Sequence, residues 1–114
     1  MQKQNGVRFS ESGEGIVAYL SGEIDHHTAK TVREEIDALL FRKRPRELSL
    51  DFSEVKFMDS SGIGLIIGRG EVCRTLNAKL RVVGLSGTQR KLVRLSGVGK
   101  IQGISIEEER AGKR

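Results

Sequence analysis

Segments with a strand-like pattern and segments with a helix-like pattern alternate along almost the whole chain. In the first kind, apolar residues alternate with polar ones or run together, and in the second they recur every three or four positions. Strand-like segments cover residues 7–9, 16–20, 47–52, 80–85 and 104–106, and helix-like segments cover residues 29–39, 63–74 and 88–95. This alternation predicts an α/β domain with at least some parallel strand pairing and a sheet covered by the helices.

The ends of these segments carry further predictions. The first two strands are predicted to form an antiparallel hairpin, because Ser12–Gly15 has the residues of a tight turn. The chain is predicted to leave the sheet at Ser21–Asp25, and Ser53–Met58 is predicted to connect the third strand to the second helix. Asp25 or Thr28 is the best candidate to cap the first helix, because each offers a side-chain oxygen to its free N–H groups.

The length and composition set the class of protein. The 114 residues are enough for one domain, and 37% hydrophobic with 31% charged residues is typical of a folded globular chain. No stretch approaches the roughly 18 apolar residues of a membrane-spanning helix, and the first six residues lack the apolar region of a secretory signal. The lone cysteine, Cys73, cannot form an internal disulfide. A small, reduced, cytoplasmic domain is therefore expected.

The net charge of +5 is unevenly distributed. Residues 1–41 hold four Lys/Arg and seven Asp/Glu, a net charge of −3, whereas residues 42–114 hold 16 and eight, a net charge of +8. Only Arg42–Arg46 is dense in positive charge, and the chain has four Phe, one Tyr and no Trp to stack on bases. We therefore favour solvated basic turns over a nucleic-acid-binding groove and expect no direct nucleic-acid contact.

The segment Phe57–Gly70 holds four glycines within nine residues, which is costly inside a helix because each glycine destabilises it by about 1 kcal/mol relative to alanine. We expect Gly64 and Gly68 to allow close packing of the helix on the sheet. Gly62 is expected to keep the entrance of the helix accessible.

Known chemical motifs fit this segment poorly. Its glycine spacing is one residue too long for a dinucleotide-binding loop, no Walker A lysine follows, and the GxSxG elbow of serine hydrolases is missing. Two histidines and one cysteine do not have a zinc-site spacing. No cofactor and no metal are expected. A small serine-dependent enzyme using Ser60 and His27 remains the alternative from a different class.

Ser60 and Ser61 are predicted to lie at the N-terminus of the second helix, where free N–H groups and the helix dipole favour an anion. Two interpretations stay open. One serine caps the helix, or a serine hydroxyl accepts a phosphoryl group, whose charge of about −1.5 to −2 would change the surface seen by a partner.

Two motifs together resemble the STAS family. They are Gly22-Glu23-Ile24-Asp25-His26-His27-Thr28-Ala29 and Phe57-Met58-Asp59-Ser60-Ser61-Gly62-Ile63-Gly64, and the resemblance extends over about residues 7–106. Within that family the chain is most similar to the sporulation-type anti-sigma factor antagonists, called SpoIIAA. The resemblance implies a STAS-like domain over residues 7–106, with a mixed sheet, an N-terminal extension at 1–6 and a charged tail at 107–114.

The resemblance also implies a function. The unphosphorylated antagonist binds an anti-sigma factor that is a serine kinase using ATP, so that the sigma factor is released. The first serine of the Asp-Ser-Ser-Gly motif corresponds to Ser60 and is the expected phosphorylation site. A PP2C-type phosphatase resets the switch. The chain is then a regulator and not an enzyme, and no membrane contact is expected.

We expect the partner to bind a surface formed by both motifs and the following helix. Its predicted residues are Asp25, His26, His27, Thr28, Asp59, Ser61, Gly62 and Arg69. For the two histidines, partner contact and a plain role in the capping loop are equally open. The chain is more basic than is common for this type, and its tail lacks the apolar positions of the family's last helix. A STAS module of a stress-response or other signalling pathway, with a different kinase, is therefore the alternative.

Overall fold

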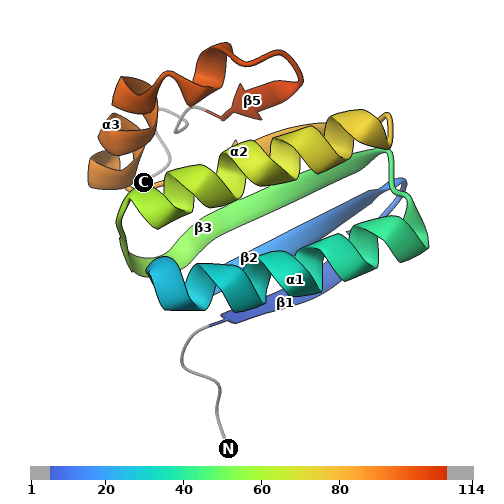
Figure 1. The fold of residues 1–114 in the computed structure, drawn as a ribbon, viewed down its shortest axis with the longest axis horizontal. Helices are drawn as coiled ribbons and strands as arrows, with labels where there is room; N and C mark the ends of the chain where they lie inside the picture. Colours follow the sequence, from blue (N-terminus) through green and yellow to red (C-terminus); the bar gives the residue numbers. More distant parts are fainter. Residues whose placement is uncertain (1–5, 108–114) are drawn as a thin grey trace, which may run out of the picture.

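Five strands form one mixed sheet in which they lie side by side in chain order (Figure 1). The computed structural model describes residues 6–107, so most of the predicted extension and tail lies outside the described residues. The strands are β1 (Gly6–Ser12), β2 (Gly15–Ile24), β3 (Glu47–Met58), β4 (Lys79–Val83) and β5 (Ile104–Ile106). β1 and β2 pair antiparallel, which confirms the hairpin, and the other neighbouring pairs are parallel.

The two longest helices, α1 (His26–Lys43) and α2 (Ser60–Thr75), lie side by side over one face of this sheet (Figure 1). Their inward side chains pack on the sheet in one hydrophobic core. The helix α3 (Gly87–Ser96) and a short 3-10 helix, η1 (Val98–Lys100), connect β4 to β5. The buried amide of Gln89 in α3 donates to the Val55 carbonyl of β3 at 3.0 Å, which ties α3 to the sheet. The predicted α/β fold class is confirmed.

Two predicted strand ends are wrong, because β2 and β3 run on to the starts of the following helices. β2 continues to Ile24 instead of leaving the sheet at Ser21, and β3 continues to Met58 instead of ending at Phe52. The pairing of β2 with β3 shifts register twice within this region. Such bulges interrupt the alternation of apolar and polar residues, so the sequence pattern resembles a loop.

The helix ends follow the capping rules closely. Asp25 caps α1 by accepting a hydrogen bond from the Thr28 N–H at 2.9 Å, so Asp25 is the cap among the predicted candidates. Ser86 and Gln89 form a reciprocal capping box at the start of α3. Gly97 ends α3 with a φ of 81°, a left-handed conformation that glycine adopts without steric strain.

The expected roles of the α2 glycines are wrong. A Cβ atom on Gly64 or Gly68 would meet nothing within 4 Å, so these two glycines do not pack on the sheet. Gly62 is buried, and a Cβ there would lie 2.8 Å from the Met58 sulfur, while a Cβ on Gly70 would lie 2.6 Å from Ile104 Cδ1. Close packing therefore involves Gly62 and Gly70. The spacing of the glycines along the helix does not distinguish these two from Gly64 and Gly68.

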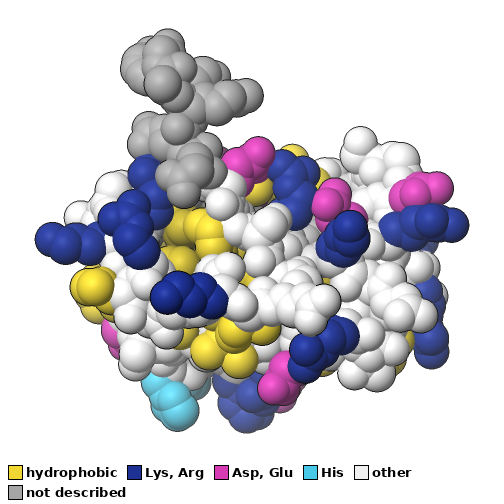
Figure 2. All heavy atoms as spheres, turned by 90° about the horizontal axis from the view of Figure 1, so that it is seen from above, with side chains coloured by type: hydrophobic (Ala, Val, Ile, Leu, Met, Phe, Trp, Pro, Cys, Tyr) yellow, Lys and Arg dark blue, Asp and Glu magenta, His cyan; other side chains and the backbone are white. Residues whose placement is uncertain are grey.

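Lys and Arg side chains are spread over the face that Figure 2 shows, with hydrophobic and acidic side chains between them. They form no continuous basic stripe on that face. Along residues 6–107, no helix is both long and apolar enough to cross a membrane.

Candidate functional site

The two sequence motifs meet where β2 and β3 end. Ile24 and Met58 are paired residues of these parallel strands, and the Asp59 N–H donates to the Ile24 carbonyl at 3.4 Å. Each strand passes directly into a helix, so the starts of α1 and α2 lie next to each other (Figure 1). The segments Asp25–Thr28 and Asp59–Gly62 are thus brought together at the carboxyl edge of the sheet, a common position for functional residues in α/β folds.

An aspartate caps each of the two helices. Asp59 accepts from the Ser61 N–H at 2.8 Å, as Asp25 does from Thr28. The hydrogen bond from the Thr28 backbone is the main cause that lowers the pKa of Asp25 below its ordinary value of 3.8, and nearby His27 acts in the same direction. The Asp25 carboxylate therefore stays ionised at neutral pH, and no further acidic residue stands in the first turn of either helix.

Ser60 is the first residue of α2 and is exposed. Because Asp59 supplies the cap, the interpretation of a serine as the capping residue is wrong. Ser61 is partly buried and faces the space between α1 and α2. The Ser60 hydroxyl is thus available to solvent at a helix N-terminus, next to a carboxylate.

The sequence did not distinguish His26 from His27, but the two side chains have different surroundings in the structure. Both are exposed, but only His26 lines the space that Ser61 also lines. Among the hydrogen bonds of residues 6–107, none joins a histidine to Ser60 or Ser61, so the serine–histidine pair of a nucleophilic enzyme is not formed. Over the same range, no three His, Cys, Asp or Glu side chains are close enough to hold a metal ion.

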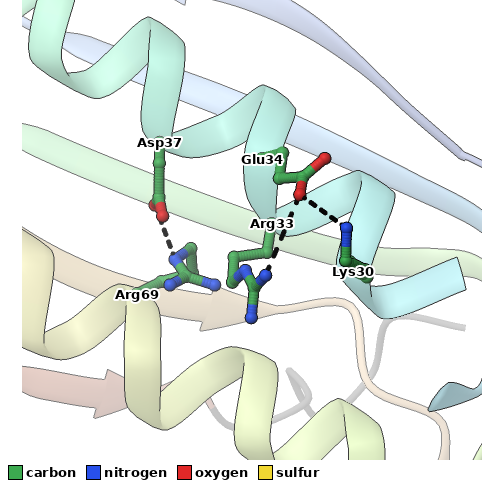
Figure 3. Close-up of polar contacts among 5 residues, drawn as sticks. All are labelled: Lys30, Arg33, Glu34, Asp37 and Arg69. Atoms are coloured by element: carbon green, nitrogen blue, oxygen red, sulfur yellow. Dashed lines mark hydrogen bonds and ion pairs between the residues drawn. The ribbon is translucent and has the colours of Figure 1, made fainter. Parts of the chain in front are cut away.

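Arg69, predicted as part of an exposed partner surface, is buried instead. It lies in the third turn of α2, and only 4% of its surface is exposed. Its Nε lies 2.8 Å from Oδ1 of Asp37 in α1, so the ion pair joins the two helices (Figure 3). Burial lowers the pKa of Arg69 and the Asp37 carboxylate opposes this, so the guanidinium remains charged at neutral pH.

A groove of about 530 Å³ runs between α1 and α2 and reaches the cap region. Ser61, Gly64 and Gly68 line it from α2, and His26, Lys30 and Arg33 line it from α1. Lys30, Arg33 and Asp37 were not predicted from the sequence. Their spacing of three and four residues places them on one side of α1 and is the sequence signal for this side of the helix.

A large apolar side chain stands beside the site. Phe57 is the next-to-last residue of β3 and is 52% exposed, whereas its neighbour Met58 is buried. An exposed aromatic ring next to a functional segment is the kind of side chain that anchors protein interfaces.

Comparison with known proteins agrees with the sequence resemblance. An anti-sigma F factor antagonist from Paenibacillus polymyxa is 33% identical over 96 residues, which cover 84% of this chain and 82% of that protein. An anti-sigma-B factor antagonist from Listeria monocytogenes is 33% identical over 95 residues, 82% of each chain.

Solved structures give the same result. The anti-sigma factor antagonist SpoIIAA in its unphosphorylated form matches with a TM-score of 0.75 and 28% identity, covering 90% of this chain and 89% of that one. SpoIIAA from Bacillus in the phosphorylated form matches with a TM-score of 0.68 and 29% identity, covering 90% and 92%. The STAS domain family itself matches residues 3–111. The chain therefore belongs to the STAS domain family.

Proposed function

We propose that the chain is an anti-sigma factor antagonist controlled by phosphorylation of Ser60. In this proposal the unphosphorylated chain binds an anti-sigma factor that is also a serine kinase, which frees the sigma factor. Transfer of the γ-phosphoryl group of ATP to Ser60 weakens this complex, and a PP2C-type phosphatase restores it. The kinase supplies the nucleotide site and its magnesium, so this chain is a substrate and a regulator in the cytoplasm rather than an enzyme.

The observation that carries the proposal is the position of Ser60. Its hydroxyl is exposed, is not needed for capping, and stands at the junction of both motifs. The relatives named as anti-sigma factor antagonists, and the two forms of SpoIIAA that differ in phosphorylation, support the same role.

The electrostatics around Ser60 explain how a phosphate can act as a switch. The first turn of α2 contains no acidic residue and has free N–H groups, so a phosphoserine does not melt the helix. The Asp59 carboxylate is the adjacent residue, however, and a partner that covers this surface must exclude water from two neighbouring negative groups. A difference of about 2–4 kcal/mol changes partner affinity by tens to about a thousandfold.

The partner surface in this proposal comprises the segments Asp25–Thr28 and Asp59–Gly62 together with exposed Phe57. The carboxylates of Asp25 and Asp59 are held in place by the hydrogen bonds with which they cap the helices, so the partner meets them in fixed positions. Phe57 supplies apolar contact area. The anti-sigma-B relative favours a second candidate, a STAS module of a stress-response pathway with another kinase.

Phosphorylation is tested with the cognate anti-sigma factor kinase. The protein is incubated with that kinase and ATP, and its intact mass is measured. We expect one added phosphate in the native chain and in Ser61→Ala, and none in Ser60→Ala. Phosphate on Ser61, or an unmodified native chain, contradicts the proposal.

The effect of the charge is tested by binding. We expect Ser60→Asp to weaken binding to the kinase by tenfold or more, as roughly 1.4 kcal/mol corresponds to tenfold. Ser60→Asn is the matched control, because it has nearly the same shape without the charge, and it should bind much more tightly than Ser60→Asp. Equal affinities for the two variants contradict the charge argument.

A further inference from the structure

We infer that the groove between α1 and α2 binds an acidic segment of the anti-sigma factor, with a carboxylate placed between Arg33 and Arg69. This inference rests on the proposed function, because it names the chemistry of the partner at the neighbouring surface. It adds a second contact region to the one at the helix starts.

The groove carries more positive than negative charge. Lys30, Arg33 and Arg69 line it together with His26. The acidic residues next to these cations already have partners, since Glu34 contacts Lys30 at 3.0 Å and Asp37 contacts Arg69 at 2.8 Å. Burial is the main cause that lowers the pKa of Arg69, and repulsion from the neighbouring charge of Arg33 lowers it further. An anion in the groove would remove this repulsion.

Arg69 has hydrogen-bonding capacity that the fold does not use. Its Nε lies 2.8 Å from the Asp37 carboxylate, whereas its buried Nη1 has no hydrogen-bond partner among the described residues. Buried donors without acceptors are rare in folded proteins, and a guanidinium can serve a carboxylate with two parallel N–H groups. The unused donors therefore indicate that Arg69 has an acceptor in the functional complex.

Arg33 can move to complete the site. Its nearest acidic contact is Glu34 at 4.0 Å, its side chain is 47% exposed, and it points into the space between the helices (Figure 3). Such a loose, exposed ion pair contributes little to stability, so rotation toward an incoming carboxylate is inexpensive.

Gly64 and Gly68, which close packing does not require, form part of the lining of the groove. Nothing stands within 4 Å of where their Cβ atoms would be. Keeping glycine there costs helix stability, about 1 kcal/mol at each position. The two glycines are explained, despite their cost to helix stability, if a partner approaches the α2 backbone at these positions.

The size and position of the groove favour a protein segment over a small anion. A volume of about 530 Å³ is far larger than one phosphate or carboxylate group. The groove also shares His26 and Ser61 with the proposed partner surface, so a chain bound at the helix starts can continue into it. An acidic segment of the same partner satisfies the charge, the size and the continuity together.

The first test reverses one charge. Binding to the kinase is measured by isothermal titration in the presence of ADP, so that no phosphoryl group is transferred. We expect Arg33→Glu to weaken binding by about tenfold or more and to reduce its salt dependence. Arg42→Glu is the matched control, since it makes the same change of charge on an exposed residue in the last turn of α1, and we expect at most about a threefold change.

The second test fills the groove without changing the charge. Gly68→Leu places a neutral side chain whose Cβ atom meets nothing within 4 Å and whose outer atoms extend into the groove, so the fold should be retained and thermal unfolding should confirm this. We expect a loss of kinase binding of about tenfold or more. Normal binding by Gly68→Leu, or equal losses in Arg33→Glu and Arg42→Glu, overturns the inference.

The third test separates a protein partner from a small ligand. ATP, GTP and inorganic phosphate are titrated separately into the native chain, and we expect no binding at micromolar concentration. Micromolar binding of one of these that is lost in Arg33→Glu, with kinase binding unchanged, overturns the inference and assigns the groove to a small anion. A native chain that binds no anti-sigma factor contradicts the proposed function as well, whereas normal binding by both groove variants contradicts the inference alone.

Discussion

The two sides of α2 use the same residue type for opposite purposes. Toward the sheet, Gly62 and Gly70 make room for Met58 and Ile104, and larger side chains would collide with the core. Toward the groove, a Cβ atom on Gly64 or Gly68 would meet nothing within 4 Å, so no contact within the fold calls for glycine there. The difference teaches that a glycine-rich helix can contain both packing and functional glycines, and that only their neighbours distinguish them.

The largest expected effect comes from the ion pair that joins the helices across the groove. Arg69→Ala leaves Asp37, whose side chain is only 26% exposed, without a cation, and should lower the free energy of unfolding by about 2–3 kcal/mol. Urea denaturation measures the loss. Lys30→Ala is the control, because it breaks the exposed pair with Glu34 and should cost at most about 0.5 kcal/mol. Equal losses would show that burial does not distinguish the two pairs.

The packing side is tested by adding the same side chain on both sides of the helix. Gly70→Leu must displace Ile104 and Leu80, so we expect a loss of about 1–3 kcal/mol in the free energy of unfolding. The Cβ atom of Gly64→Leu meets nothing within 4 Å and the variant gains helix propensity, so its stability should equal or exceed that of the native chain. If denaturation curves show that both variants are less stable than the native chain, or that both are more stable, the distinction between packing and groove glycines is wrong.

The groove side is tested by the smallest substitution. Gly64→Ala and Gly68→Ala should each raise the free energy of unfolding by about 0.5–1 kcal/mol, because alanine is the better helix former and its Cβ is unobstructed. Thermal unfolding should show the higher midpoint, and the double variant should show the sum. Destabilised variants would mean that the open space belongs to the fold itself.

The effect that is smallest at neutral pH concerns the thiol on the packed side of α2. Burial raises the pKa of Cys73 to about 11 from an ordinary value of 9.0. Its contribution to stability is therefore complete below about pH 9 and is lost as the pH rises through 11. Denaturation between pH 8 and pH 11 should show a steeper decline for the native chain than for Cys73→Ala, and parallel curves would contradict the shifted pKa.

Much of the local structure could be predicted because local chemistry decides it. The hairpin turn and the cap of α1, for which the sequence offered Asp25 or Thr28, depend on residues within a few positions of each other. The extension of β2 to Ile24 could not be predicted in this way. Its register against β3 shifts twice, and the shifts depend on a strand more than twenty residues away.

The candidate site shows the same division. The sequence placed Ser60 and Ser61 at the start of a helix, because the signals of a helix N-terminus are local. The burial of Arg69 was missed, since it depends on Asp37, a residue 32 positions earlier on another helix. The groove was missed for the same reason, because its walls come from two helices that the sequence describes only one at a time.

The sequence by itself determined the alternation of strands and helices, a cap for α1 at Asp25 or Thr28, and the place of Ser60 and Ser61 at a helix N-terminus. These follow from hydrophobic period and capping chemistry, which act over a single turn of chain. Only the tertiary structure decided which glycines pack and which line a groove, and that Arg69 is buried between the helices. Those properties depend on atoms contributed by distant segments, which come together only when α1 and α2 pack side by side on the sheet.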